Sequence, residues 1–443
     1  MKNVILYSAE VTERLTYIAQ LIFEQLLGCE VELTTSLDVY TASKAAQINY
    51  STHLEIPGYP IQPSSLLFED NIRHVAIEQG TSWMSVPTLY LDTSSHFDAL
   101  AASFYLVSRY EEYLPFKKDD HNRFTASQSC LQQLGLLQLP LVNKWAVNLQ
   151  RELMALYPNF KPNPRTFEYL STIDIDQAWK YKNKGFIRNC GGLLRDVIQN
   201  KWAEVRARIS VLTNNQPDVF FNFDWQDRVH EEFDVKAHYF MQVGGRSKFD
   251  KNTDLTNAEF QQLIKRLDQK YNVGIHPSYK SNHRHALVAQ ERQALEHIVA
   301  HDITSSRQHF LMHEMPETYQ RLYNIGVKQD HTMGYSTHLG FRAGIAAPFY
   351  FFDLSKNEST NLELVPFCCM DITPLYYMEQ SPSQAVTTVT DLMDEVKKVG
   401  GLFVSLWHNE SMSEDGRWHG WRTVYYQMLN HAHKLTAKHE REA

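Results

Sequence analysis

The feature that most limits the fold of this chain is a regular alternation of short apolar strands and helices after residue 165. The predicted strands cover residues 167–175, 235–243, 272–276, 303–310, 325–330, 362–372 and 402–407. Helical segments lie between most of them, notably at residues 257–270, 284–300, 314–324 and 384–398. Strands that alternate with helices favour parallel βα units, and about seven such units can curl into a barrel.

The first part of the chain predicts a separate, smaller α/β domain of unassigned role, residues 1–160. Residues 4–7 are typical of a strand, and residues 13–27 have the apolar spacing of an amphipathic helix. Three prolines fall within residues 158–165 and indicate a linker. We therefore expect the barrel, followed by a C-terminal helix, to occupy residues 165–443.

Two further stretches of the N-terminal part have an expected structure. Residues 97–112 read as a long helix, and the charged, turn-rich residues 116–127 read as a loop. Near the helix end, Arg109, Glu111 and Glu112 could form a polar cluster. A solvated helix end explains the same residues equally well.

Composition excludes several classes of function. The 43 Lys and Arg residues against 51 Asp and Glu give a net charge of −8, which leaves no basic surplus to neutralise nucleic-acid phosphates or to bind an anionic membrane. No apolar run approaches the ~20 residues of a membrane span, and the N-terminus does not resemble a signal peptide. The odd, scattered cysteines make a disulfide framework improbable, so the cytoplasm is the expected location. They are Cys29, Cys130, Cys190, Cys368 and Cys369.

Two carboxylates end the first predicted barrel strand, in the stretch Ser171–Asp176. Because side chains alternate along a strand, Asp174 and Asp176 point the same way. Two carboxylates on one face repel each other unless a cation lies between them or one acts as a base. An Asx turn at a strand end is the simpler alternative.

The residues at the ends of the other predicted strands favour a functional site over an Asx turn. Titratable residues follow five of the seven predicted strands, and in parallel barrels chemistry gathers at the carboxyl ends of the strands. Any one of them is more often structural than functional, but packing does not explain the set. The residues beyond the aspartate pair are His276, Arg307, His309, Asp330, His331 and His408.

These residue types support metal-assisted hydrolysis. One carboxylate and two imidazoles suit zinc or another divalent transition metal, with positions left open for water and substrate. Such a metal lowers the pKa of its water towards ~7 and polarises a carbonyl group. A second carboxylate would take the water proton, and a histidine would protonate the leaving group.

Residues 165–410 resemble the polysaccharide deacetylase (NodB-homology) family of carbohydrate esterases, which has a distorted (β/α)7 barrel. Its Thr-x-Asp-Asp motif is similar to Thr172–Asp176, apart from one extra residue between the carboxylates. The resemblance implies that Asp174 is the catalytic base and Asp176 a metal ligand. The family's His-x-x-x-His-Pro motif is matched only by His276, since Lys280 occupies the place of a second histidine.

The last two motifs of the family bring in further roles. The Arg-x-Pro-Tyr/Phe motif resembles Arg307–Phe310, with His309 in place of proline. The resemblance therefore implies that His309 replaces the missing second histidine as a metal ligand. Arg307 would support the base, and His408, in Leu406-Trp407-His408, would be the general acid. A divergent branch of the family shares these variations and carries an uncharacterised N-terminal domain.

The sequence thus predicts an α/β protein in which a distorted (β/α)7 barrel follows a smaller N-terminal domain. Its expected function is removal of an N-acetyl group from a sugar or polysaccharide, with a divalent metal, most simply zinc, held by Asp176, His276 and His309. Two alternatives stay open: hydrolysis of another amide or cyclic C–N bond, and a non-catalytic carbohydrate-binding barrel.

Other candidates have equally simple structural explanations. Asp330, Arg342 and Trp407 could contact the substrate, but Arg342 could also pair with Asp330 or Asp353, and Trp407 could be core. Gly244 and the two residues after it could approach the substrate or form a plain turn. Cys368 and Cys369 lie in an apolar strand and are expected in the core. Five further histidines are expected not to bind metal: His283, His285, His313, His331 and His338.

Overall fold

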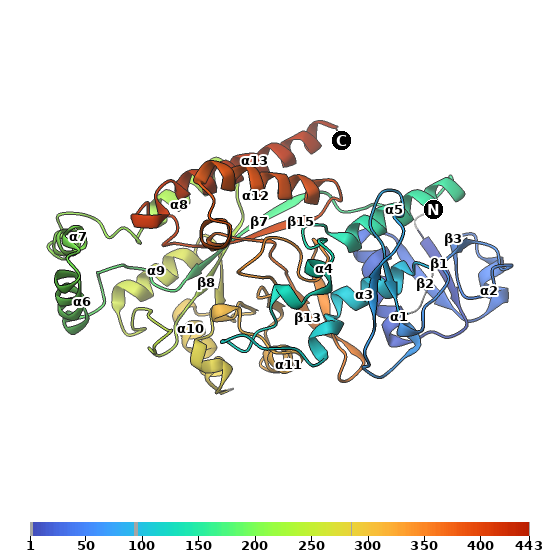
Figure 1. Ribbon diagram of the computed structural model, residues 1–443, viewed down its shortest axis with the longest axis horizontal. Coiled ribbons are helices and arrows are strands. Elements are labelled where there is room, and N and C mark those ends of the chain that lie inside the picture. Colours follow the sequence, from blue (N-terminus) through green and yellow to red (C-terminus); the bar gives the residue numbers. More distant parts are fainter. Residues whose placement is uncertain (1–2, 93–95, 285, 443) are drawn as a thin grey trace.

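The computed structural model describes residues 3–92, 96–284 and 286–442 of the chain. Figure 1 shows an elongated body with the N-terminal strands at one end, the large sheet in the middle and α6 and α7 at the opposite end. The strands are β1 Asn3–Ser8, β2 Glu30–Thr34, β3 Ala46–Tyr50, β4 Tyr59–Pro60, β5 Ile77–Gln79, β6 Leu89–Leu91, β7 Glu168–Ile175, β8 Ala237–Met241, β9 Asn272–Ile275, β10 Ser305–Ser306, β11 Gln329–Asp330, β12 Phe349–Asp353, β13 Glu358–Leu364, β14 Cys369–Met370 and β15 Leu402–His408.

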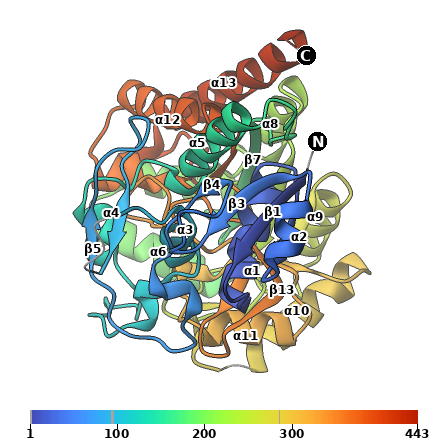
Figure 2. The same ribbon diagram turned by 90° about the vertical axis from the view of Figure 1, so that its right-hand side faces the viewer.

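Helices surround both groups of strands. They are α1 Glu13–Ala19, α2 Leu37–Ala42, α3 Ala99–Val107, α4 Cys130–Gln133, α5 Leu141–Leu156, α6 Phe186–Ile198, α7 Trp202–Leu212, α8 Phe223–Glu232, α9 Ala258–Asp268, α10 Ala286–Val299, α11 Glu317–Asn324, α12 Pro382–Lys397 and α13 Trp421–Glu442. Figures 1 and 2 both show α12 and α13 packed side by side along one edge of the molecule.

The N-terminal segment, residues 3–160, contains a parallel sheet in the order β2-β1-β3-β4. The predicted strand at residues 4–7 is β1, whose residues after Asn3 are all buried. The predicted helix 13–27 begins as α1, capped by the Thr12 side chain, and continues as a wider helical turn over Gln20–Leu26. The predicted helix 97–112 is shorter than expected, because Arg109 adopts a left-handed backbone (φ 53°) after α3 ends.

The large sheet has nine strands in the order β12-β13-β11-β10-β9-β8-β7-β15-β14. All adjacent strands in this sheet pair in parallel, except β12 and β13, which form an antiparallel hairpin that the sequence did not indicate. Strand β8 is buried along its whole length, as expected for a central parallel strand covered on both faces. The helices between the strands lie close to their predicted positions; α12, for example, begins at Pro382 and is capped by Ser381 and Gln384.

The predicted strand 362–372 is in fact divided between two strands near opposite edges of this sheet. Its first part belongs to β13, which pairs with β11 and with the edge strand β12, and its last part contains β14, the edge strand beside β15. Pro366 lies between them and has no N–H to donate to a ladder. Val365 and Cys368 on either side of it donate to the carbonyl oxygens of Asp330 and Val404. No strand pair among the described residues closes the sheet, so the expected closed barrel is not observed.

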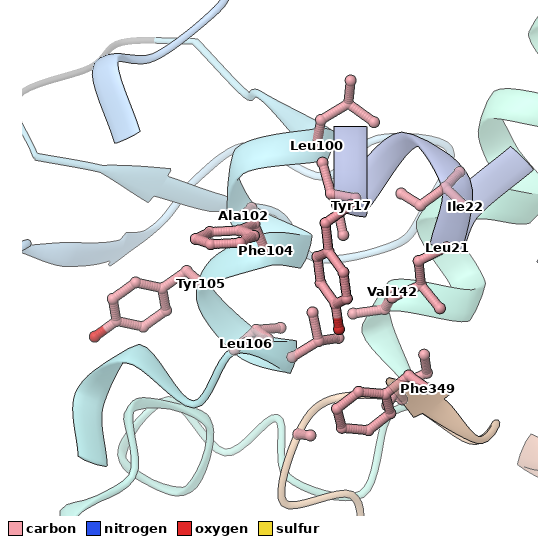
Figure 3. Packing of buried hydrophobic residues seen from close by; sticks show 14 of the residues in the cluster. Tyr17, Leu21, Ile22, Leu100, Ala102, Phe104, Tyr105, Leu106, Val142 and Phe349 are labelled. Carbon is pink, nitrogen blue, oxygen red and sulfur yellow. The ribbon is translucent and has the colours of Figure 1, made fainter. Parts of the chain in front are cut away.

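The larger hydrophobic core crosses the expected domain boundary. It includes Tyr17, Leu21 and Leu106 of the N-terminal segment together with Phe349 and Phe352 from β12. Figure 3 shows Tyr17 between the side chains of α3 and Phe349. The division at residue 160 thus stays a prediction, because the two parts share packing across it.

The polar residues after α3 are a buried cluster and not a solvated helix end. Arg109 donates to Glu112 Oε1 (2.7 Å) and to Glu111 Oε1 (2.8 Å). Arg342, from the other side of the boundary, donates to both carboxylate oxygens of Glu112 at 2.9 and 2.7 Å. We call Arg109, Glu111, Glu112 and Arg342 the closed ion cluster.

The other end of the molecule carries α6 and α7, which expose a row of apolar side chains to solvent. Phe186 and Ile187 are more than four-fifths exposed, and Trp202 is about half exposed. Among the helices of the described residues, none combines the length and the apolar character that crossing a bilayer requires.

Candidate metal centre

The site lies at the carboxyl ends of the central parallel strands. Asp174 on β7 stands opposite His408 on β15 and Phe240 on β8 in the two adjoining ladders. Asp176 and His276 follow β7 and β9 directly, and His309 lies three residues beyond β10. Since neighbouring parallel strands end at one rim, residues far apart in the chain meet here.

Asp176, His276 and His309 form a tight group, with one potential ligand atom from each within 4.8 Å of the others. His276 Nε2 lies 3.2 Å from Asp176 Oδ1, and His309 Nε2 lies 3.6 Å from the same oxygen. Both histidines are nearly fully buried, whereas the Asp176 side chain is 30% exposed. Burial opposes ionisation of Asp176, but His309 and His276 outweigh it and hold the pKa of this carboxyl well below its usual range.

Each histidine of the group is oriented by a second contact. His276 Nδ1 lies 2.6 Å from the carbonyl oxygen of Arg307, and because a carbonyl only accepts, Nδ1 carries the hydrogen. His309 Nδ1 lies 3.1 Å from Oδ1 of the buried Asp250. These contacts leave Nε2 of both rings facing Asp176, which is the arrangement that metal-binding histidines adopt.

The group fits a divalent metal ion. Asp176 Oδ1 is buried and makes no hydrogen bond, although two imidazole nitrogens face it. A buried carboxylate oxygen without a hydrogen-bond donor is costly, and a cation shared with the two nitrogens would remove that cost. One carboxylate and two imidazoles form a donor set that suits zinc and similar transition metals.

Arg307 holds Asp174 beside the histidine group, where Asp174 Oδ2 lies 3.8 Å from His276 Nε2. Arg307 Nη1 donates to Asp174 Oδ1 (2.9 Å), and Nη2 donates to Thr172 Oγ1 (2.7 Å). The guanidinium is fully buried and also lies over the ring of Phe240, 4.6 Å from its centroid. Asp174 therefore has a fixed position and a permanent positive partner.

His408 lies near Asp176 and pairs with Asp371. Its Nδ1 lies 3.1 Å from both oxygens of Asp371, and its Nε2 lies 4.0 Å from Asp176 Oδ2. Burial disfavours the charged imidazolium, but Asp371 and, more weakly, Asp176 outweigh it and raise the pKa of His408 to about 10. At neutral pH the ring can therefore give up a proton.

These groups border a cavity of about 260 Å³. Glu410 also lines it, and burial raises the pKa of this carboxyl. Two residues from the N-terminal segment, His121 and Arg123, complete its wall. The sequence did not single out Asp250, Asp371, Glu410 or His121; for Asp371 and Glu410, their positions next to β14 and His408 were the available signal.

None of the three residues suggested for substrate binding lines the cavity of the metal centre, although Arg342 lines a neighbouring cavity. Asp330 is fully buried and accepts hydrogen bonds from Ser306 and Thr332. Trp407 is 1% exposed and packs edge-on against Tyr425, as in its core alternative. Arg342 pairs with Glu112 of the closed ion cluster, and not with Asp330 or Asp353.

None of the remaining candidates that the structure describes belongs to the histidine group. His313 and His331 are buried outside the histidine group, His338 is half-buried, and His283 is exposed; His285 lies outside the described residues. Gly244 packs so closely on Ser278 and Glu291 that a Cβ would lie within 2.5 Å of them. Cys368 and Cys369 are buried, and all five cysteines are free thiols.

Comparisons with known proteins match different parts of the chain. The model of a family of unknown function, DUF7033, matches residues 4–158. No curated protein matches the chain. Among solved structures, a protein described as a polysaccharide deacetylase from Mycobacterium smegmatis has 13% identity and a TM-score of 0.38, over 61% of this chain and 86% of that one.

Two other solved structures are similar to the same extent or less. Puue allantoinase has 7% identity and a TM-score of 0.38, over 60% of this chain and 83% of its own. The polysaccharide deacetylase Bc1974 from Bacillus cereus has 12% identity and a TM-score of 0.28, over 59% and 85%. Because these TM-scores are below 0.5, the likenesses assign neither fold nor activity, and the function of this chain is argued from its site.

Proposed function

We propose that this chain is a metal-dependent hydrolase that removes an N-acetyl group from a carbohydrate. The observation that carries the proposal is the convergence of Asp176, His276 and His309 on one point beside a cavity. Zinc is the proposed ion, because it prefers imidazole nitrogen and carboxylate oxygen in a site with open positions. When bound, it would polarise the acetyl carbonyl and make a water more acidic.

Asp174 is the proposed general base. Asp174 lines the cavity, and its hydrogen bond from Arg307 fixes the orientation of the carboxylate. A base in this position takes a proton from the attacking water. Arg307 also donates to Thr172, so it fixes the base from its buried side and is a positioning residue.

His408 is the proposed general acid. It lines the cavity across from Asp174, and Asp371 holds its Nδ1 so that Nε2 faces the cavity side of Asp176. The imidazolium would donate a proton to the departing sugar amine, which otherwise leaves as an unstable anion. The proposed base and acid thus lie opposite each other on the neighbouring strands β7 and β15.

The deciding experiment combines metal content with acetate release. For the wild-type protein we expect about one divalent ion per chain and release of acetate from N-acetylated sugars. His276→Ala should lose both, because it removes one of three ligands. The matched control is His283→Ala, which changes an exposed histidine of the same loop and should retain both.

Three results would contradict the proposal in different ways. Full activity of metal-free His276→Ala would remove the metal from the mechanism. Cleavage of a cyclic amide without release of acetate from any sugar would move the chemistry to another C–N bond. Absence of both a bound ion and turnover in the wild-type protein would favour a non-catalytic binding role.

A further inference from the structure

A second cavity, of about 440 Å³, lies next to the metal centre. Its volume is in the range of small-molecule sites, roughly 300–1,000 Å³. One wall comes from the loop 116–127 of the N-terminal segment and the other from residues 334–338 of the C-terminal part. Neither wall contains a proposed metal ligand.

The two cavities adjoin each other. Four residues line both of them: Arg123, Leu311, Ser336 and Tyr377. Arg123 therefore stands at the junction between the metal centre and the second cavity. A ligand longer than one sugar ring can occupy both spaces without displacing a side chain of the metal group.

The loop 116–127 is fixed against the residues that carry the metal centre. Arg123 donates from Nη1 to the carbonyl oxygen of Phe310 (2.7 Å) and from Nε to Asp119 Oδ2 (2.8 Å). His121 Nδ1 lies 3.1 Å from Tyr279 Oη, and its ring packs edge-on against Phe310. Phe310 directly follows the proposed ligand His309, so the loop forms a preorganised wall of the site.

The lining of the second cavity suits a neutral, hydroxyl-rich ligand. Its lining includes four residues with hydroxyl side chains, Thr125, Ser127, Ser336 and Thr337, together with Tyr377, which is 52% exposed. Such rings offer a flat apolar face on which a sugar can stack.

The charges of this cavity are already balanced. Arg123 is paired with Asp119, and Arg342 with Glu112. A guanidinium has five N–H donors, so Arg123 keeps donors for a ligand after serving Asp119 and Phe310. An anionic ligand would have to compete with these carboxylates, whereas sugar hydroxyls can bond to both members of the Arg123–Asp119 pair.

We propose that the loop 116–127 builds a sugar-binding subsite beside the metal centre, and that the substrate is a neutral N-acetylated oligosaccharide of two or more rings. The ring that loses acetate occupies the metal centre, and a neighbouring ring lies between Arg123 and Tyr377. This inference rests on the proposed deacetylase function. It gives the N-terminal segment a direct part in substrate selection.

The test compares N-acetylglucosamine with its β-1,4-linked tetramer. We expect the wild-type protein to prefer the tetramer in kcat/KM and in calorimetric binding. Arg123→Ala should lower kcat/KM for the tetramer about ten- to a hundredfold, a larger loss than for the single sugar. Arg123→Lys should recover only part of the loss, because an ammonium lacks the planar fork.

A second variant separates the subsite from the contact with Phe310. Thr337→Trp would fill the second cavity from its other wall without touching Arg123, and should weaken only the tetramer. Arg151→Ala, which changes an exposed arginine of α5 far from the cavities, is the matched control and should act as wild type. Metal content and thermal midpoint of every variant check that the metal centre is intact.

The outcomes distinguish this inference from the function on which it rests. Equal loss on both sugars in Arg123→Ala, or unchanged use of the tetramer in Thr337→Trp, would overturn the subsite. Equal binding of the single sugar and the tetramer by the wild-type protein would overturn it as well. If no acetate is released but both variants lose tetramer binding, the subsite stands and the hydrolase proposal fails.

Discussion

Among the buried charged residues that the structure describes, the closed ion cluster and the metal centre differ in how their charges are satisfied. In the closed ion cluster, Arg109 and Arg342 meet Glu111 and Glu112, and the four formal charges balance. Arg109 also donates to the carbonyl oxygen of Arg342 at 2.5 Å. Every charge there has a partner within the chain.

The metal centre has the opposite character. Asp176 Oδ1 lacks a hydrogen bond although two histidine nitrogens face it, and the group borders a cavity. Buried charges that all pair with one another are explained by folding alone. A buried carboxylate oxygen that has no hydrogen bond points instead to a ligand outside the chain. The contrast teaches that burial of ionisable residues alone does not indicate a functional site.

Glu112→Ala tests the closed ion cluster and should have the largest effect on stability. It leaves two buried arginines without their shared carboxylate, so the free energy of unfolding should fall by about 3–5 kcal/mol. Urea denaturation followed by circular dichroism measures the change. Glu78→Ala, at an exposed position of β5, is the control and should lie within about 0.5 kcal/mol of wild type. An equal fall in the free energy of unfolding of both variants would mean that the closed ion cluster does not contribute more to stability than an exposed residue.

Asp176→Asn tests the metal centre in the same assay. Without metal, the free energy of unfolding should fall by less than in Glu112→Ala, because no hydrogen bond to Oδ1 is lost and only the attraction between the carboxylate and the two histidines disappears. Zinc at a hundred times its Kd should stabilise the wild-type protein by about 2.7 kcal/mol and the variant by nearly nothing. Equal stabilisation of both proteins by zinc would place the ion elsewhere.

Asp371→Asn tests the electrostatics of the proposed acid. Asp371 helps to raise the pKa of His408 to about 10, so the imidazolium that donates the proton is present below that pH and is lost as pH rises through it. Without this carboxylate the pKa should drop by about one to two units. The alkaline limb of the kcat–pH profile should move to lower pH by the same amount. An unmoved limb would assign the acid to another group.

Lys280→Ala should have the smallest effect. Lys280 occupies the place of the second histidine in the motif of the deacetylase family, yet it is exposed and donates to the carbonyl oxygen of Arg246. Because His309 lies with Asp176 and His276, metal content should be unchanged and kcat/KM should stay within about twofold. Loss of the ion in this variant would contradict the placement of His309.

Local patterns were enough to locate most strands and helices of the large sheet. The runs that form β7, β8, β9 and β15 are rich in apolar residues, and each strand lies within about two residues of its predicted place. The break between β13 and β14 could not be read in this way. Residues 362–372 are one apolar run, and only their pairing with different partners divides them.

The candidate site shows the same limit. Asp174, Asp176 and the histidines at strand ends could be singled out, because parallel strands bring their carboxyl ends to one rim. Asp250 and Asp371 could not, since each matters only through the ring that it contacts. The substrate suggestions Asp330 and Trp407 point into packed interior, and strand register alone does not separate interior from cavity.

The sequence by itself determined the strand–helix order, the strand ends and the residue types that reach them, because these follow from periodicity and side-chain chemistry within short windows. The tertiary structure alone decided which buried charged residues pair with one another, as in the closed ion cluster, and which meet without a hydrogen bond, as in the metal centre. It also decided that a loop from the N-terminal segment lines the cavities. Such contacts join residues more than a hundred positions apart, and no local pattern encodes the distance between them.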